Sequence, residues 1–185
     1  MWLRNILRKI LGTIGLIDTT DYTSIDALRK RGVKIGNNVD IINTMIDGSF
    51  GFLCSIGDNV TLTGVRILTH DASTKKFLGY SKIGKVEIGN NVFVGNGAII
   101  LPNVKIGNNV IVGAGTIVAK DVPDNVVIVG NPWRIICSCD EYIERNRNMM
   151  ENSIVSDVPW WEYSTEEQQK GLLERICPPK YGYNV

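Results

Sequence analysis

The sequence has little histidine and no pattern of cysteines typical of a metal site or a disulfide framework. A single histidine occurs in 185 residues, and the cysteines at positions 54, 137, 139 and 177 include no CxxC pair. We therefore expect no metal, and we expect reduced thiols in a cytoplasmic protein. The sequence also lacks an apolar run of about 18 residues and a small-residue cleavage site near its start. Neither a membrane span nor a signal peptide is predicted.

Charge of one sign is not in excess either. Lysine and arginine total 20, aspartate and glutamate total 19, and the net charge is +1. The longest basic run, residues 29–31, is too short to indicate a nucleic-acid-binding patch. With 44% hydrophobic residues, the chain is expected to form one compact domain with short extensions.

The dominant feature of the chain is a six-residue repeat between residues 86 and 121. It reads VEIGNN, VFVGNG, AIILPN, VKIGNN, VIVGAG and TIVAKD, with an aliphatic residue at the third place of every block. Residues 86–101 are identical to residues 104–119 at ten positions, so three blocks form one unit of eighteen. Short β-branched segments separated by Gly and Asn at this period are typical of a parallel β-helix.

Each block is predicted to form one strand and one corner of a three-sided prism. The aliphatic third residues would point inward and stack on their equivalents one coil away, about 4.8 Å along the axis. Smaller residues two places earlier would fill the space beside them, and Gly and Asn at the corners would accept positive φ angles. The predicted inward residues are Ile88, Val94, Ile100, Ile106, Val112 and Val118.

Two irregular segments interrupt the earlier coils. The first coil begins at residues 33–41 and is interrupted at residues 47–52, and the second begins at residues 54–62 and is interrupted at residues 70–84. A solenoid tolerates insertions at its corners, where they commonly form the binding face. We therefore expect the functional site at these interruptions.

Segments with helical patterns flank the repeat. Residues 2–14 form an amphipathic pattern that suits packing or peripheral membrane contact, with three basic residues on the wheel: Arg4, Arg8 and Lys9. A short helix is expected over residues 24–31, and helices over residues 138–150 and 165–176 are expected to cap the coil stack. The predicted divisions are an N-terminal helical segment (1–32), an all-β β-helix domain (33–136) with an excursion (70–84), and a C-terminal helical extension (137–185).

Four sequence features resemble a known family, the hexapeptide-repeat acyltransferases. They are the Ile-Gly-x-x-x-x repeats and the sequences LTHDAS (68–73), GAG (113–115) and GNPWR (130–134). The resemblance covers residues 24–136 and is closest to the galactoside, maltose and polysaccharide O-acetyltransferases. It implies a left-handed parallel β-helix, a homotrimer, and transfer of an acetyl group from acetyl-CoA to a hydroxyl or an amine. The left hand comes from the resemblance alone, because general rules for crossover connections favour the right hand.

His70 is the candidate general base. Transfer of an acetyl group to a hydroxyl needs a base that removes the acceptor proton, and an imidazole suits this task at neutral pH. A lone histidine is more often a surface or packing residue, but the position of His70 at the second interruption and the family resemblance favour catalysis.

Two carboxylates are candidate partners of this histidine or of the substrate. Asp47 lies in the first interruption, where it could reach the same side of the prism one coil away, and the resemblance implies a substrate-binding acid in that coil. Asp71 is adjacent to His70, but in an extended chain its side chain would point away from that residue. We favour Asp47 as the orienting acid and keep Asp71 as a second substrate-binding candidate.

The resemblance also implies a path for acetyl-CoA. The pantetheine arm would run outside the later coils and the phosphates would lie near the end of the β-helix. Lys120 and Arg134 would supply positive charge, and Trp133 would stack on adenine or cover the last coil. The matching positions are Asn96, Ala114, Ala119, Lys120, Trp133 and Arg134.

The predicted function is acetyl transfer to a hydroxyl of a sugar or a cell-surface polysaccharide precursor. A sugar N-acetyltransferase of the same fold and a non-catalytic β-helix scaffold remain alternatives. A γ-type carbonic anhydrase is excluded because it needs three zinc-binding histidines. A sugar nucleotidyltransferase is not expected, because 32 residues before the first coil leave no room for its nucleotide-binding domain.

A homotrimer is expected from the outward side chains as well as from the resemblance. Several apolar residues alternate with the inward set and would face water on a monomer. They are Phe93, Ile99, Ile111 and Ile117.

Overall fold

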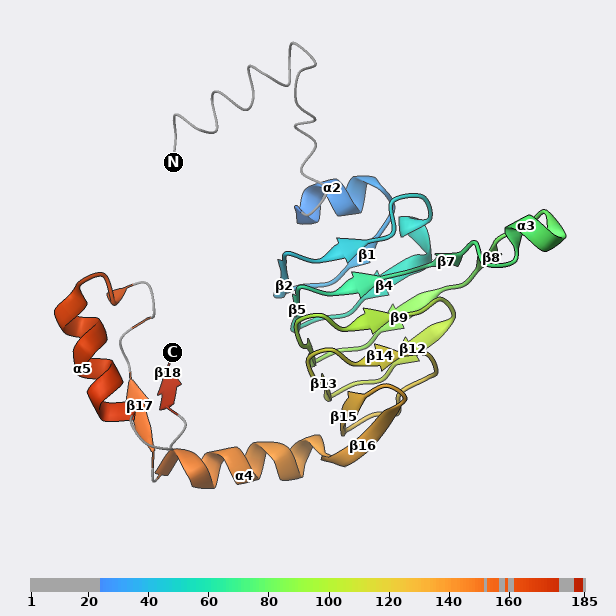
Figure 1. Ribbon diagram of the computed structural model, residues 1–185. Coiled ribbons are helices and arrows are strands. Elements are labelled where there is room, and N and C mark those ends of the chain that lie inside the picture. The colour runs from blue at the N-terminus through green and yellow to red at the C-terminus, as the bar shows by residue number, and fades with distance from the viewer. Residues whose placement is uncertain (1–23, 152, 157–158, 160–161, 177–181, 185) are drawn as a thin grey trace, which may run out of the picture. The chain divides into compact units, whose positions relative to one another are not determined.

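The computed structural model describes residues 24–151, 153–156, 159, 162–176 and 182–184 (Figure 1). The chain forms two compact units, Met1–Ser138 and Cys139–Val185. The amphipathic pattern at residues 2–14 lies outside the described residues, so its helix and its membrane contact stay predictions. Within the described residues, no helix is long and apolar enough to cross a membrane.

The first unit is the predicted parallel β-helix, and its strands form the three faces of a prism (Figure 1). The first sheet contains β1 (Lys34–Ile35), β4 (Cys54–Ile56), β9 (Val86–Ile88) and β12 (Val104–Ile106). The second sheet contains β2 (Val39–Ile42), β5 (Val60–Thr63), β10 (Val92–Val94), β13 (Val110–Val112), β15 (Val126–Gly130) and β16 (Trp133–Ser138). The third sheet contains β3 (Met45–Ile46), β6 (Arg66–Ile67), β11 (Ile99–Ile100) and β14 (Ile117–Val118).

The strand register confirms the repeat of eighteen. Val92 pairs with Val110 in the second sheet, and Ile99 pairs with Ile117 in the third. In the first sheet Ile56 pairs directly with Ile88, although 32 residues separate them along the chain. The extra residues of that turn therefore leave the stack as an excursion.

The inward residues predicted from the repeat form the core. Ile88 is 4% exposed and the other five are fully buried, while the smaller residues two places earlier are at most 2% exposed. The short helix α2 (Ile25–Lys30) packs over the first coil, because its Leu28 belongs to this core. Ser24 caps α2 as expected, accepting a hydrogen bond from the backbone N–H of Ala27 at 3.2 Å. At the other end β16 folds back antiparallel on β15.

The corners use Asn and Gly for two different reasons. Asn91 and Asn109 have φ angles of 55° and 54°, as the repeat predicted, and the Asn91 side-chain amide donates to Asn109 Oδ1 at 3.0 Å. Gly89, directly after an inward aliphatic residue, does not have a positive φ. A Cβ there would lie 2.6 Å from the carbonyl oxygen of Gly107, so the glycine is needed because successive coils approach closely.

The second unit contains α4 (Cys139–Glu151) and α5 (Glu166–Ile176), close to the two helices expected. It also contains a parallel pair of strands that the sequence patterns did not indicate, β17 (Ile154–Ser156) and β18 (Gly182–Asn184). Because β16 runs to Ser138, the unit boundary falls two residues after the predicted boundary at 136/137. The capping role of this extension stays a prediction.

Candidate active site

The two interruptions meet at the corner of the prism between the third and first sheets. The first interruption follows β3 and includes a short 3-10 helix, η1 (Gly51–Leu53). The second forms an arm of β7 (His70–Asp71), α3 (Lys75–Leu78) and β8 (Lys82–Ile83), which projects away from the coils (Figure 1). Its two strands pair antiparallel, and Gly84 N–H donates to Thr69 O at 2.9 Å at the base of the arm.

His70 and Asp47 form a hydrogen-bonded pair at this corner. The His70 Nδ1 atom bonds to the Asp47 Oδ2 atom. The Asp47 side chain is 2% exposed, whereas the His70 side chain is 36% exposed. Because a carboxylate can only accept, Nδ1 carries the proton and Nε2 is left as the basic nitrogen.

Asp47 is held ionised by its hydrogen bonds. Burial raises the pKa of this carboxyl, but the bonds it accepts from His70, from Ser49 N–H and from Thr69 N–H outweigh burial and bring the pKa to about 2. The distances to the Ser49 and Thr69 nitrogens are 2.9 and 3.1 Å. Asp47 is thus a fixed negative charge beneath the imidazole at neutral pH.

The residues around the pair lock the first interruption in place. The Thr69 hydroxyl donates to Phe50 O at 3.0 Å, and the Arg31 guanidinium donates to Asp47 O at 2.6 Å. The Phe50 ring lies against the imidazole, with centroids 5.5 Å apart. These contacts limit the rotation of His70, which an acid–base catalyst needs.

Sequence reasoning did not identify Thr69, Phe50 and Arg31 as parts of the site. Phe50 lies inside the first interruption, and Thr69 directly precedes the second, within the sequence LTHDAS. That context was the signal available for both residues. Arg31 belongs to the turn after α2, and nothing in the sequence indicated that it would bind the backbone of Asp47.

Asp71 has a different environment from Asp47. Its carboxylate lies 2.7 Å from Lys82 Nζ and accepts from the Ser73 N–H and hydroxyl, at 2.8 and 3.0 Å. The bond from Lys82, followed by those from Ser73, lowers the pKa of Asp71 to about 2. Asp71 therefore joins β7 to β8 within the arm, and its role in binding substrate stays a prediction.

The residues expected to bind acetyl-CoA lie at two corners. Asn96 and Ala114 are exposed and stacked at the corner between the second and third sheets, where Gly115 N–H donates to Asn96 O at 2.9 Å. A Cβ added to Gly115 would meet no atom within 4 Å, so the strip outside this corner is open and suits an extended pantetheine arm.

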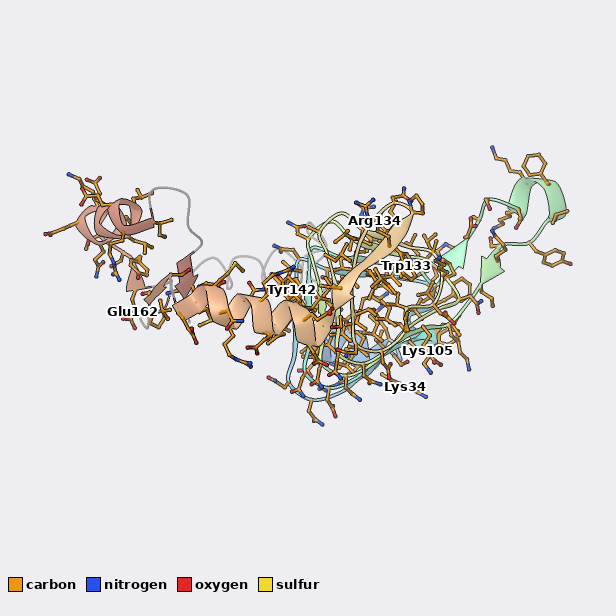
Figure 2. The ribbon with its side chains drawn as sticks, turned by 90° about the horizontal axis from the view of Figure 1, so that it is seen from below. Lys34, Lys105, Trp133, Arg134, Tyr142 and Glu162 are labelled. Carbon is orange, nitrogen blue, oxygen red and sulfur yellow. The ribbon has the colours of Figure 1, made fainter. Side chains whose placement is uncertain are left out.

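Ala119 and Lys120 lie at the corner between the third and first sheets, on the last full coil. Lys120 Nζ is 4.7 Å from the centre of the Trp133 ring, and Arg134 is exposed on β16 (Figure 2). Trp133 packs against the core, and its buried Nε1 has no hydrogen-bond partner among the described residues. The two cations at this end of the β-helix fit the phosphates of a nucleotide.

Comparisons with known proteins agree with this architecture. The family model described as bacterial transferase hexapeptide (six repeats) matches residues 85–120. Protein CapG of Staphylococcus aureus is 48% identical over 126 residues, which cover 64% of this chain and 73% of CapG. The chain belongs to the hexapeptide-repeat acyltransferases.

Other acetyltransferases are also similar to this chain. The chloramphenicol acetyltransferase of Klebsiella aerogenes is 28% identical over 75% of this chain and 68% of its own. A solved structure of a galactoside acetyltransferase in complex with coenzyme A is 33% identical, covers 61% of this chain and 58% of that chain, and superposes with a TM-score of 0.54. The β-helix of this acyltransferase is left-handed, as the sequence resemblance implied.

Within the residues that the structure describes, no three His, Cys, Asp or Glu side chains are placed to hold a metal ion.

Proposed function

We propose that this acyltransferase transfers the acetyl group of acetyl-CoA to a hydroxyl of a sugar or of a polysaccharide precursor, with His70 as the general base. The observation that supports this most directly is the pairing of His70 with Asp47 at the corner where two coils are interrupted. A histidine with no function on the surface needs neither a buried carboxylate partner nor neighbours that restrict its rotation. A general base needs both, because its tautomer and its orientation must be fixed.

In the proposed reaction His70 Nε2 accepts the proton of the acceptor hydroxyl as the hydroxyl oxygen attacks the carbonyl carbon of the thioester. Asp47 keeps the proton on Nδ1 and stabilises the imidazolium that forms. The imidazolium then gives its proton to the sulfur that leaves as the free thiol of CoA. Protons balance over this cycle, and His70 returns to its starting state.

Acetyl-CoA is the proposed acetyl donor. The galactoside acetyltransferase that resembles this chain was solved with coenzyme A, and the open strip at Asn96 and Ala114 and the cations Lys120 and Arg134 suit its arm and phosphates. We assign Asn96, Ala114 and Ala119 to the arm and Lys120, Trp133 and Arg134 to the nucleotide.

The proposed working unit is a homotrimer whose active sites are shared between chains. Ala114 and Ala119 are separated by one extended side of the prism, up to about 16 Å, so the two sets of donor-binding residues are apart on one chain. A cleft between neighbouring chains brings such corners together.

An apolar surface for contact between chains lies near the corner between the second and third sheets. There Phe93 is 45% exposed, and Ile99, Ile111 and Ile117 are half-buried. Sedimentation velocity should give a trimer, and a monomer at working concentration would contradict this assembly.

The function is tested by measuring free thiol released from acetyl-CoA with neutral glycans, acidic glycans, amino sugars and chloramphenicol as acceptors. Products are then treated with mild base, which hydrolyses O-acetyl esters and leaves N-acetyl amides intact. A base-labile glycan product is expected. A base-stable product would assign an N-acetyltransferase, and no acceptor-dependent thiol release with any acceptor would favour the non-catalytic scaffold.

A further inference from the structure

The three faces of the prism differ in the residues that they present outward. In the second and third sheets the outward positions of the later coils are apolar, with Phe93 next to Ile111 and Ile99 next to Ile117. In the first sheet the register aligns polar and charged residues across all four strands. They are Lys34, Ser55, Glu87 and Lys105. In the proposed trimer the apolar faces suit contact with other chains, which leaves the first sheet as the face toward water.

Two hollows lie side by side on this charged face. One, of about 90 Å³, is lined by residues that include Lys34, Phe52, Lys85 and Glu87. The other, of about 270 Å³, is lined by Lys85, Glu87, Asn103, Val104, Lys105 and Asp121. Because they share Lys85 and Glu87, they form one open trough across the strands of the first sheet.

Positive charge predominates in the trough. None of the ammonium groups of Lys34, Lys85 and Lys105 forms an ion pair with a described residue, and all three side chains are exposed. Of the two carboxylates, Asp121 already accepts a hydrogen bond from the Lys105 backbone N–H at 2.8 Å. Figure 2 shows Lys34 and Lys105 extending outward from the same side of the prism.

The trough adjoins the proposed active site through two aromatic residues. Phe52, which lines the smaller hollow, is 58% exposed, and its ring centre lies 6.2 Å from that of Phe50. Phe50 in turn contacts the His70 imidazole. An exposed aromatic ring between a base and a row of cations is suited to the apolar face of a sugar ring.

We propose that this trough binds an anionic segment of the glycan acceptor, next to the residue whose hydroxyl is acetylated at His70. The proposal rests on the proposed function and names its substrate class: a glycan that carries carboxylate or phosphate groups. Lys34 and Lys105 lie three strand spacings apart, about 14 Å, so each can contact a different charged group of a glycan several sugars long. Phe52 stacks on one sugar ring, and Glu87 accepts hydrogen bonds from its hydroxyls.

Binding is measured by calorimetry on the full-length protein with tetragalacturonate as the carboxylate-bearing probe and maltotetraose as the neutral one. Tetragalacturonate should bind more tightly than maltotetraose, and its affinity should fall as salt is raised. The triple variant Lys34→Gln, Lys85→Gln, Lys105→Gln should bind tetragalacturonate about 10-fold more weakly. Lys170→Gln, in α5, is the matched control and should bind it like wild type.

The phosphates of the donor are the other anion that lysines attract, so a second titration is made with acetyl-CoA. If the triple variant loses affinity for acetyl-CoA but not for tetragalacturonate, or if the two tetrasaccharides bind equally, the proposal is wrong. A third outcome is that tetragalacturonate binding depends on the lysines but no glycan is acetylated. That result would support the trough as a glycan-binding site and contradict the proposed function.

Discussion

The regular coils and the interrupted corner between the third and first sheets belong to the same β-helix, but they bury different kinds of side chain. In the coils, the residues that the third sheet buries, Ile100 and Val118, are aliphatic. In the first coil the residue after the buried Ile46 is Asp47, whose carboxylate is also buried, beneath His70. Burying an aliphatic side chain stabilises the fold by about 1.5 to 3 kcal/mol, whereas a buried charge is tolerated only when it is paired and hydrogen-bonded. The coils therefore supply the apolar core, and the interruptions hold the residues of the proposed active site.

The largest effect is expected from a cavity in the regular coils. Ile106 is fully buried, so Ile106→Ala should lower the free energy of unfolding by about 2 to 5 kcal/mol. Ile83→Ala is the matched control in the arm, where the side chain is 59% exposed, and should change it by less than about 0.5 kcal/mol. Urea denaturation measures both. Equal losses would show that the arm contributes to the folded core.

The second test removes the proposed base. His70→Ala should lower kcat at least about 10²-fold, while the affinity for acetyl-CoA and the denaturation midpoint stay close to those of wild type. Added imidazole should restore part of the rate, because it replaces the missing base. Turnover near the wild-type rate would remove His70 from the mechanism.

The third test changes the carboxylate beneath the base. Asp47→Asn should lower kcat at least about 10-fold, because the tautomer of His70 is no longer fixed, and should destabilise the fold by about 1 to 3 kcal/mol, because a buried N–H loses its acceptor. Asp71→Asn is the control in the exposed arm and should change stability much less. If the two substitutions have the same effect on kcat, Asp47 is not the orienting acid.

The His70–Asp47 pair should also make the free energy of unfolding depend on pH. The pKa of Asp47 falls from 3.8 to about 2 on folding, so its contribution to stability is present above pH 3.8 and is lost as the pH falls toward 2. Wild type should therefore lose more stability than Asp47→Asn over this interval, by an amount on the order of 2 kcal/mol. Parallel curves of unfolding free energy against pH would contradict this.

The smallest effect is expected at the far end of the β-helix. Arg134→Ala should raise the KM for acetyl-CoA about 10-fold and leave kcat nearly unchanged, since a phosphate contact is made equally in the ground and transition states. Arg175→Ala, in α5, should leave both constants unchanged. An unaltered affinity of Arg134→Ala for acetyl-CoA would place the nucleotide elsewhere.

The sequence by itself determined the coils and the identity of the candidate base. A six-residue period fixes which side chain points inward at each strand, and the shared period of eighteen fixes the register, so Ile88 to Val118 could be assigned to the core directly. A single histidine at a break in the repeat left one candidate for the base. One prediction was wrong, because Gly89 does not have the positive φ angle expected at a corner. The glycine is needed for the close approach of the next coil, and the backbone of that coil is not part of an argument from local φ angles.

Only the tertiary structure decided which groups surround His70 and which charges gather on one face. The paths of irregular segments depend on contacts between distant residues, so the sequence left both Asp47 and Asp71 as candidates and gave no sign of Arg31. Lys34 and Lys105 stand at the same place in two VKIGNN blocks, so the repeat places both on the first sheet, although the excursion lies between them along the chain. Lys85 lies outside these blocks, and only the stacking of parallel coils about 4.8 Å apart joins the three lysines in one continuous surface.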